Sequence, residues 1–256
     1  MRKTSISVVG SGNVATHLAL ALHQAGCEVR QVLSRSIDHA QLLARRVDAR
    51  AVCRWQQLDE DADVYLLAVP DDALYELALD LRLPGALVIH TSGSTPLSVL
   101  KPVSDRAGVV WSPQTFVRDI AMDYSLLPLC IEGSCPDVEQ QIQALFAQVS
   151  TNIFRLDHQH RRQAHLAAVW VSNFVNAINA TAQEIMRQAG LDFDMLRPLA
   201  EQTLSKWDYG NLWLQQTGPA IRHDDKTLDA QRRLLSQSRP DLLPLYDDLT
   251  ALIQSR

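Results

Sequence analysis

The chain has 256 residues, 46% of them hydrophobic and 21% charged, so it is long enough for one large domain or two modest ones with a substantial core. Its net charge of −5 at pH 7 argues against a general nucleic-acid-binding protein, because such proteins carry a basic surplus that neutralises phosphates. No apolar run approaches the ~20 residues that a membrane-spanning helix needs. We therefore expect a cytoplasmic protein that binds neither nucleic acid nor membranes.

The first part of the chain alternates apolar runs with segments of helical spacing. The apolar runs at residues 6–9, 29–33, 63–69 and 86–90 predict strands, and residues 15–24, 38–46 and 72–81 predict the helices between them. Further strands are expected at residues 109–111, 129–131 and 152–154, with a helix at 137–149. This alternation predicts an α/β domain, a doubly wound parallel sheet with helices on both faces.

Near residue 157 the sequence pattern changes from alternating strands and helices to helices alone. Residues 158–189 contain neither Gly nor Pro and predict one helix of roughly 45 Å, which Gly190 ends. Three shorter helices are expected at about 195–206, 228–237 and 242–255, with an irregular stretch at 207–225. We therefore expect an N-terminal Rossmann domain over residues 1–155 and an all-helical C-terminal domain over residues 156–256.

A glycine-rich turn connects the first strand to the first helix. It reads Gly10-Ser11-Gly12-Asn13-Val14-Ala15 and fits the pattern GxGxxA. Gly10 permits the tight turn, Gly12 lets backbone approach a pyrophosphate, and Ala15 keeps the helix close to the strand. The helix N-terminus then offers free N–H groups and a positive dipole end to the anion. In this setting the motif predicts a dinucleotide site, and a βα turn without a ligand is the alternative.

The residues after the second strand favour NADP(H) over NAD(H). An NAD-selective site usually carries Asp or Glu here to bind the ribose 2′-hydroxyl, but this chain has Ser34, Arg35 and Ser36. Their hydroxyls and guanidinium suit a 2′-phosphate, although Arg35 could also be an ordinary surface arginine. Two further strand ends meet the same edge of the sheet and are expected to complete the cofactor site: Ala68, Val69 and Pro70, and then Thr91 and Ser92.

The long predicted helix has two distinct faces at about 100° per residue. One face is apolar and predicts core: Leu166, Trp170, Phe174, Ala177, Thr181 and Ile185. The opposite face carries uncharged hydrogen-bonding side chains, with Asn173 on its flank: His165, Ser172, Asn176, Asn179 and Gln183. Such a stripe suits a polar cleft or a helix–helix interface, and a solvated face is the alternative.

The four cysteines do not indicate a metal site or a disulfide framework. Cys27, Cys53, Cys130 and Cys135 show no CxxC spacing and no accompanying histidine pattern. We expect each to be a small buried or half-buried hydrophobic residue, and we expect no bound metal.

The combined motifs resemble a bacterial family of Rossmann-like proteins whose C-terminal half is a domain of unknown function, DUF2520. The matching segments are residues 8–15, 68–72, 90–94, 112–116, 165–173 and 217–220. More distantly, the chain resembles the 6-phosphogluconate dehydrogenase-like superfamily, which includes ketopantoate and pyrroline-5-carboxylate reductases. The resemblance implies an NADP-dependent reductase that forms a homodimer through its helical domain.

The chain departs from that pattern on the long helix. Several of those relatives carry a Lys there with an Asn one turn later, whereas this chain has His165 followed by Val169. We expect His165 to act as general acid/base on a small carbonyl, imine or hydroxy compound, because an imidazole titrates near neutral pH, although a structural role is equally open. Further expected substrate contacts are Asn173, Gln114 and Arg222, the last of which could instead form a surface ion pair. The alternative function, which the missing lysine favours, is a non-catalytic NADP-binding sensor or interaction module.

Overall fold

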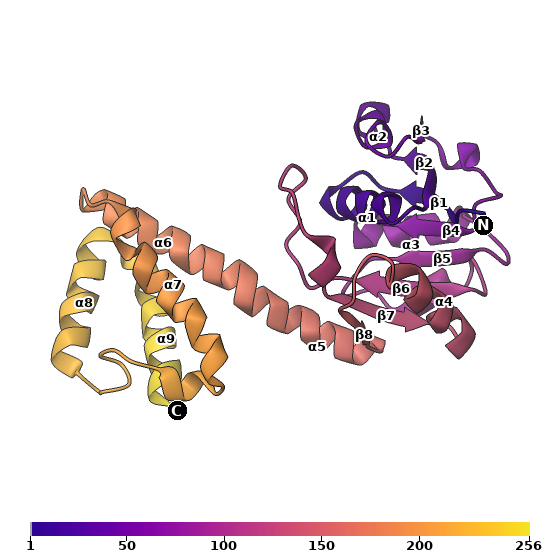
Figure 1. Cartoon of the computed structure of the whole chain (residues 1–256). Coiled ribbons are helices and arrows are strands. Elements are labelled where there is room, and N and C mark those ends of the chain that lie inside the picture. Colours follow the sequence, from indigo (N-terminus) through magenta and orange to yellow (C-terminus); the bar gives the residue numbers. More distant parts are fainter. Residues whose placement is uncertain (1) are drawn as a thin grey trace. The chain divides into compact units, whose positions relative to one another are not determined.

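The computed structural model describes residues 2–256, and within them the N-terminal part forms an eight-stranded sheet of order β3-β2-β1-β4-β5-β6-β7-β8 (Figure 1). The strands are β1 (Ser5–Val9), β2 (Glu28–Leu33), β3 (Arg50–Val52), β4 (Val64–Leu67), β5 (Leu87–His90), β6 (Ala107–Trp111), β7 (Leu129–Gly133) and β8 (Ile153–Arg155). The order of the first six is that of a dinucleotide-binding fold, with its switch point between β1 and β4. Loops at the carboxyl ends of these two strands therefore border a crevice.

The sheet is not wholly parallel as expected. Strand β7 runs antiparallel to β6, with Cys130 opposite Trp111, whereas every other neighbouring pair is parallel. The reason lies in residues 112–128, which join β6 to β7 with one short 3₁₀ turn, η3 (Tyr124–Leu126), in place of a crossover helix. Without that helix the chain returns beside β6 in the opposite direction.

Helices cover both faces of the sheet, which confirms the doubly wound α/β class. They are α1 (Asn13–Gln24), α2 (Ile37–Ala44), α3 (Asp71–Asp80) and α4 (Pro136–Phe146). Successive strand residues point to opposite faces, so Val8 packs in the core formed with α1, α2 and α4, and Val9 packs in the core formed with α3. Both valines are almost fully buried, at 0% and 1% exposed.

The long helix forms as expected but contains one π-helical turn. It runs through α5 (His158–Val169), the π turn η4 (Trp170–Phe174) and α6 (Val175–Gln188). The prediction of an apolar core face was wrong, because Leu166, Trp170 and Phe174 are 62%, 53% and 45% exposed. Val171 and Ile178, which point in other directions, are also 51% and 45% exposed, so this part of the helix is exposed on more than one side.

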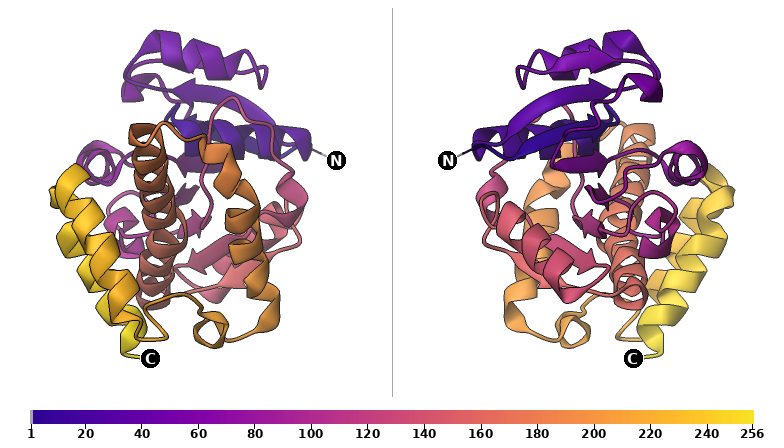
Figure 2. Two further views of the ribbon diagram at one scale, coloured as in Figure 1. Left: turned by 90° about the vertical axis from the view of Figure 1, so that its left-hand side faces the viewer. Right: turned by 90° about the vertical axis from the view of Figure 1, so that its right-hand side faces the viewer.

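The described chain divides into two compact units. The first ends at Ile178, and the second runs from Asn179 to Arg256. The second unit contains the end of α6, then α7 (Arg197–Ser205), α8 (Asp225–Ser238) and α9 (Leu243–Gln254), which confirms a helical C-terminal region. Helices α8 and α9 pack side by side (Figure 2). The expected domain boundary at residue 155 coincides with the last residue of β8 and stays a prediction. No helix within residues 2–256 has the length and apolarity needed to cross a membrane.

Candidate functional site

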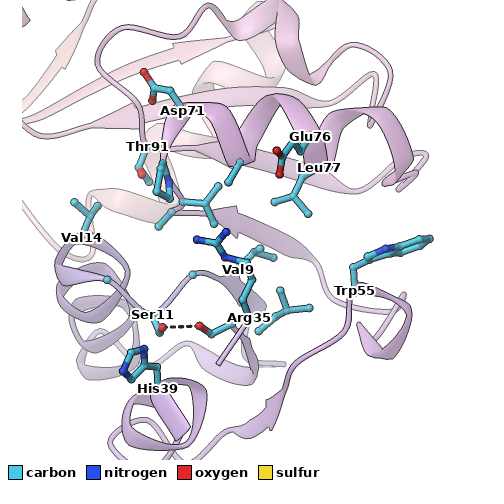
Figure 3. Close-up of a pocket in the computed structure, with 18 of the residues that line it drawn as sticks. Val9, Ser11, Val14, Arg35, His39, Trp55, Asp71, Glu76, Leu77 and Thr91 are labelled. Atoms are coloured by element: carbon cyan, nitrogen blue, oxygen red, sulfur yellow. Dashed lines mark hydrogen bonds between the residues drawn. The ribbon is translucent and has the colours of Figure 1, made fainter. Parts of the chain in front are cut away.

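A cavity of about 810 Å³ opens at the carboxyl ends of β1, β2, β4 and β5 (Figure 3). Every residue expected to bind the cofactor lines it: Gly10, Ser11, Gly12, Asn13, Val14, Ser34, Arg35, Ser36, Ala68, Val69, Pro70, Thr91 and Ser92. These residues come from four strand ends that the parallel topology gathers at one edge. The structure thus brings the set together, and its role in cofactor binding stays a prediction.

The two glycines of the turn differ in what surrounds them. Gly10 has φ of +121°, and a Cβ on it would lie 2.1 Å from the Ala68 carbonyl oxygen, so this position requires glycine. A Cβ on Gly12 would meet no atom within 4 Å. The turn therefore packs tightly against β4 on one side. On the other side it leaves open the space before the first N–H groups of α1, which is where a phosphate would bind.

Hydroxyl groups and cations gather where β2 ends. The Ser11 hydroxyl donates to that of Ser34 at 2.8 Å, and Arg35 also lines the cavity. The Ser36 hydroxyl caps α2 by accepting from the His39 amide at 3.4 Å. In Figure 3, Ser11 and His39 lie on the side of the cavity opposite α3. Sequence reasoning missed His39, although its place three residues after a capping serine puts it in the first helical turn.

The opposite end of the cavity carries a carboxylate in a hydroxyl network. The Ser94 hydroxyl donates to Asp71, and the amides of Ser94 and Thr95 donate to the Ser92 hydroxyl at 3.1 and 2.9 Å. Burial by itself raises the pKa of Asp71, but hydrogen bonds from the Ser94, Ser92 and Thr95 hydroxyls outweigh it and hold that pKa below its ordinary value. Asp71 is therefore ionised at neutral pH.

His90 lies beneath this network and is fully buried. Burial, assisted by the charge of Arg161, lowers the pKa of His90 to about 3. Its Nδ1 accepts the Ser92 amide at 3.2 Å, which places the hydrogen of the neutral ring on Nε2. His90 therefore supports the loop that carries Thr91 and Ser92.

Helix α5 brings His165 to the same loop. The buried Arg161 forms an ion pair with Glu132 of β7 and donates to the Thr95 carbonyl at 2.8 Å. One turn later, the His165 ring stands edge-on to Trp111 with 5.6 Å between centroids. A Cβ on Gly93 would lie 3.1 Å from Cγ of His165, so the imidazole packs directly on the residue after Ser92.

His165 itself does not line the cavity, and neither do the other expected substrate residues, Gln114, Asn173 and Arg222. Gln114 is exposed, and its Oε1 accepts the Thr115 amide at 2.9 Å. Asn173 is exposed in the π turn, where the neighbouring Ser172 hydroxyl lies 3.0 Å from that of Thr115. Arg222 is exposed in the second compact unit. The structure therefore brings Gln114 and Asn173 into neighbouring segments of one unit, and Arg222 belongs to the other unit.

Several cavity residues carried no motif in the sequence. Trp55, Glu76 and Arg118 all line the cavity, and Arg118 also donates to the Ser11 carbonyl at 2.9 Å. Trp55 belongs to a short 3₁₀ turn and Arg118 to an irregular loop, so neither follows a periodic pattern. Within residues 2–256, no three His, Cys, Asp or Glu side chains are grouped to hold a metal ion.

Comparisons with known proteins identify the relatives of this architecture. Residues 1–112 match the Rossmann-like domain, and residues 127–253 match the domain of unknown function DUF2520. A Bacteroides fragilis protein provisionally named an NADP oxidoreductase is 32% identical to the chain over 99% of both chains, with a TM-score of 0.92. The chain belongs to the Rossmann-like/DUF2520 family. This confirms the resemblance carried by the glycine-rich turn and the C-terminal motifs.

More distant solved structures share the fold of this chain. A reductive aminase from Aspergillus terreus in complex with NADPH and ethyl-5-oxohexanoate is 15% identical, with 99% of this chain and 93% of that one covered and a TM-score of 0.73. A pyrroline-5-carboxylate reductase from Coxiella burnetii is 19% identical, with 100% and 97% covered and a TM-score of 0.58. At these identities the likeness establishes the fold. No curated protein sequence matches the chain.

Proposed function

We propose that this Rossmann-like/DUF2520 protein is an NADP(H)-dependent oxidoreductase acting on a small carbonyl, imine or hydroxy compound. The observation that carries the proposal is the continuity of one cavity from the glycine-rich turn to Thr91 and Ser92, where His165 packs on the adjoining Gly93. A bound nicotinamide supplies the redox chemistry, and the chain supplies orientation and charge. The Bacteroides fragilis relative and the NADPH-bound reductive aminase support this reading.

Different parts of the cavity would bind different parts of the cofactor. The N-terminus of α1 and the turn from Gly10 to Val14 would hold the pyrophosphate through backbone N–H groups. Ser34, Arg35 and Ser36 would hold the 2′-phosphate, and the lack of a carboxylate among these three residues supports NADP(H) over NAD(H).

His165 is the residue that we propose for proton transfer. In the reductive direction, the substrate carbon gains a hydride and its oxygen or nitrogen gains a proton. The imidazole packs beside the loop that ends the cavity, so a substrate bound there would reach it, and its chemistry suits general acid/base work. Asn173 and Gln114, in segments joined by the contact of Ser172 with Thr115, would orient the substrate.

We also propose that the protein is a homodimer through its helical domain, residues 156–256. Two observations support association. The apolar face of Leu166, Trp170 and Phe174 is exposed, and the second compact unit has few buried side chains. Of its described side chains, only Ala220, Leu228 and Thr250 are buried. The same exposed face favours the second candidate function, an NADP-binding interaction module without catalysis.

The two functions separate in a turnover assay. NADPH oxidation is followed with a panel of carbonyl and imine compounds, for the wild-type protein and for His165→Ala. We expect kcat/KM to fall by about 10²- to 10⁴-fold in the variant, which is the usual worth of a general acid/base. The matched control is His160→Ala, which removes an exposed imidazole from the preceding part of α5. Full turnover by His165→Ala would exclude the acid/base role, and wild-type protein that binds NADPH but reduces no compound would favour the interaction module.

A further inference from the structure

The loop that joins β6 to β7, residues 112–128, folds back onto the helix that carries the glycine-rich turn. Phe116 of this loop is only 7% exposed and belongs to the main core together with residues of α1. Tyr124, further along the loop, packs against the same core. Part of the loop is thus a fixed element of the fold, although it has almost no regular secondary structure.

His17 of α1 ties the loop in place. This histidine is 2% exposed, and its ring lies 5.3 Å from that of Phe116 between centroids. Its Nε2 lies 2.8 Å from the Val117 carbonyl oxygen, so this nitrogen carries the hydrogen and donates it. Its Nδ1 lies 3.0 Å from the Tyr124 hydroxyl. Both ring nitrogens of a buried side chain on α1 are therefore used to hold one loop.

The residue after Val117 is Arg118, which this anchoring delivers to the glycine-rich turn. Its Nη2 donates to the Ser11 carbonyl at 2.9 Å, a bond that uses one of the five N–H donors of a guanidinium. Arg118 lines the large cavity and also a smaller one of about 220 Å³ beside it. The smaller cavity is bordered by His39 and Arg46 as well, with Asp119 as the carboxylate among its lining residues.

We propose that Arg118 binds a phosphate group of the dinucleotide and that His17 is the positioning residue that holds it there. The inference rests on the cofactor site proposed above, because it names a further ligand of the same molecule. Two guanidinium groups line the same cavity as Ser11, that of Arg35 after β2 and that of Arg118 from the distant loop. Either the 2′-phosphate or the pyrophosphate could bind this guanidinium, because each presents charged oxygens that accept two parallel N–H bonds from the planar group.

Binding of NADPH and NADH to Arg118→Met tests the first half of this inference. A charge-assisted hydrogen bond to phosphate is worth about a tenfold to hundredfold change in affinity, so we expect the dissociation constant for NADPH to rise by at least about tenfold. A loss confined to NADPH identifies the 2′-phosphate, and an equal loss for both nucleotides identifies the pyrophosphate. The affinity should also become less sensitive to salt, because a screened charge pair has been removed.

Two further variants make that result interpretable. Arg45→Met removes an exposed guanidinium from the end of α2 that lines neither cavity, and it should change affinity by less than about twofold. Arg118→Gln removes the charge but keeps an N–H donor, and it replaces Arg118→Met if that variant does not fold. Arg118 variants that bind both nucleotides as tightly as Arg45→Met would overturn the inference. Wild-type protein that binds neither nucleotide would instead overturn the proposed cofactor site.

The role of His17 is tested by a double-mutant cycle. Tyr124→Phe removes one partner of the His17 ring, and His17→Phe removes both hydrogen bonds while keeping an aromatic ring in the core. Each should weaken NADPH binding in the wild-type background and have no further effect in the Arg118→Met background, because the group they position is already missing. Equal effects in both backgrounds would contradict a positioning role and leave only a structural one.

Discussion

The two glycines of the phosphate-binding turn show how residues of one type serve different purposes. Gly10 is required by the fold, because its backbone has a positive φ and a Cβ would clash with the Ala68 carbonyl. Gly12 has φ of −74° and ψ of −173°, which any residue adopts, and open space where its Cβ would lie. A side chain at Gly12 would therefore enter the cavity without disturbing the chain. A substitution at Gly12 would therefore test ligand binding, whereas a substitution at Gly10 would disturb the fold.

At the same scale, His90 makes the stability of the fold depend on pH. The folded pKa of His90, about 3, lies below its ordinary value of 6.5, so the unfolded chain takes up the proton first as pH falls. The stability that a neutral His90 contributes is complete above pH 6.5 and decreases below it. Each pH unit costs about 1.4 kcal/mol, so roughly 2–3 kcal/mol should be lost between pH 6.5 and about pH 4.5.

Replacement of His90 by Asn isolates this effect. The amide oxygen of Asn can accept the Ser92 amide in place of Nδ1, while the variant has no proton to take up at this position. The free energy of unfolding, measured in urea at several pH values, should therefore decrease less steeply with acid in His90→Asn than in the wild-type protein. Parallel curves for the two proteins would show that His90 does not carry the acid sensitivity.

Some cavity residues could be predicted from the sequence and others could not, because the first follow local patterns and the second depend on contacts between distant residues. Ser34, Thr91 and their neighbours could be predicted because they follow apolar runs, and carboxyl ends of parallel strands meet at one edge. Arg118 could not, because its position depends on a hydrogen bond between His17 and Val117, 100 residues apart in sequence. No local pattern records a contact of that range.

Among the elements, α5 depends on a buried ion pair for its attachment to the sheet. Arg161 is 0% exposed and links α5 to Glu132 of β7 and to the Thr95 carbonyl. Replacing Arg161 alone with Met leaves the carboxylate of Glu132, which is 21% exposed, without its partner. The free energy of unfolding should fall by about 2–3 kcal/mol, less than for a fully buried pair because water can reach this carboxylate. Replacing Glu132 as well, in the double variant with two methionines, should restore much of that loss.

Urea unfolding of the single and double variants checks this prediction. If the double variant is no more stable than Arg161→Met, the loss arises from packing and not from an unpaired charge. Because His165 lies one turn beyond Arg161 and packs on Gly93, the single variant should also reduce any His165-dependent turnover.

The elements also show where periodicity succeeds and where it fails. The absence of Gly and Pro over residues 158–189 correctly predicted a continuous helix. The prediction that Leu166, Trp170 and Phe174 form core was wrong, because an apolar face shows that a surface must be covered but not that this chain covers it. The π turn at Trp170–Phe174 was also missed, since nothing in the composition of those five residues marks it. The antiparallel β7 was equally hidden, because it depends on a missing crossover helix and not on the strand's own residues.

For the molecule as a whole, burial is distributed unevenly between the two units. The sheet and its helices contain nearly all of the buried side chains, whereas the unit from Asn179 onward buries three of its described residues. A helical unit with so little core needs another surface for stability. We expect that surface to belong to a second copy of the chain.

Sedimentation equilibrium tests this expectation. The wild-type protein should have twice the mass of its 28.6 kDa chain, and Trp170→Glu, which places a charge in the exposed apolar face, should have the mass of a single chain. Gln163→Glu is the matched control, because it adds the same charge at an exposed polar position of α5 and should leave the dimer intact. A wild-type protein with the mass of one chain at all concentrations would contradict the dimer.

The central claim, a dinucleotide bound at the glycine-rich turn, is tested most directly by calorimetric titration of NADPH and NADH into the wild-type protein and Gly12→Ala. We predict that wild-type protein binds one NADPH per chain and binds NADH more weakly. Because Gly12 is the N-cap of α1, Gly12→Ala should unfold within a few degrees of the wild-type temperature without ligand. It should lose at least about tenfold in affinity, because its methyl group enters the phosphate space. No heat with either nucleotide, or equal affinity in Gly12→Ala, would contradict the account.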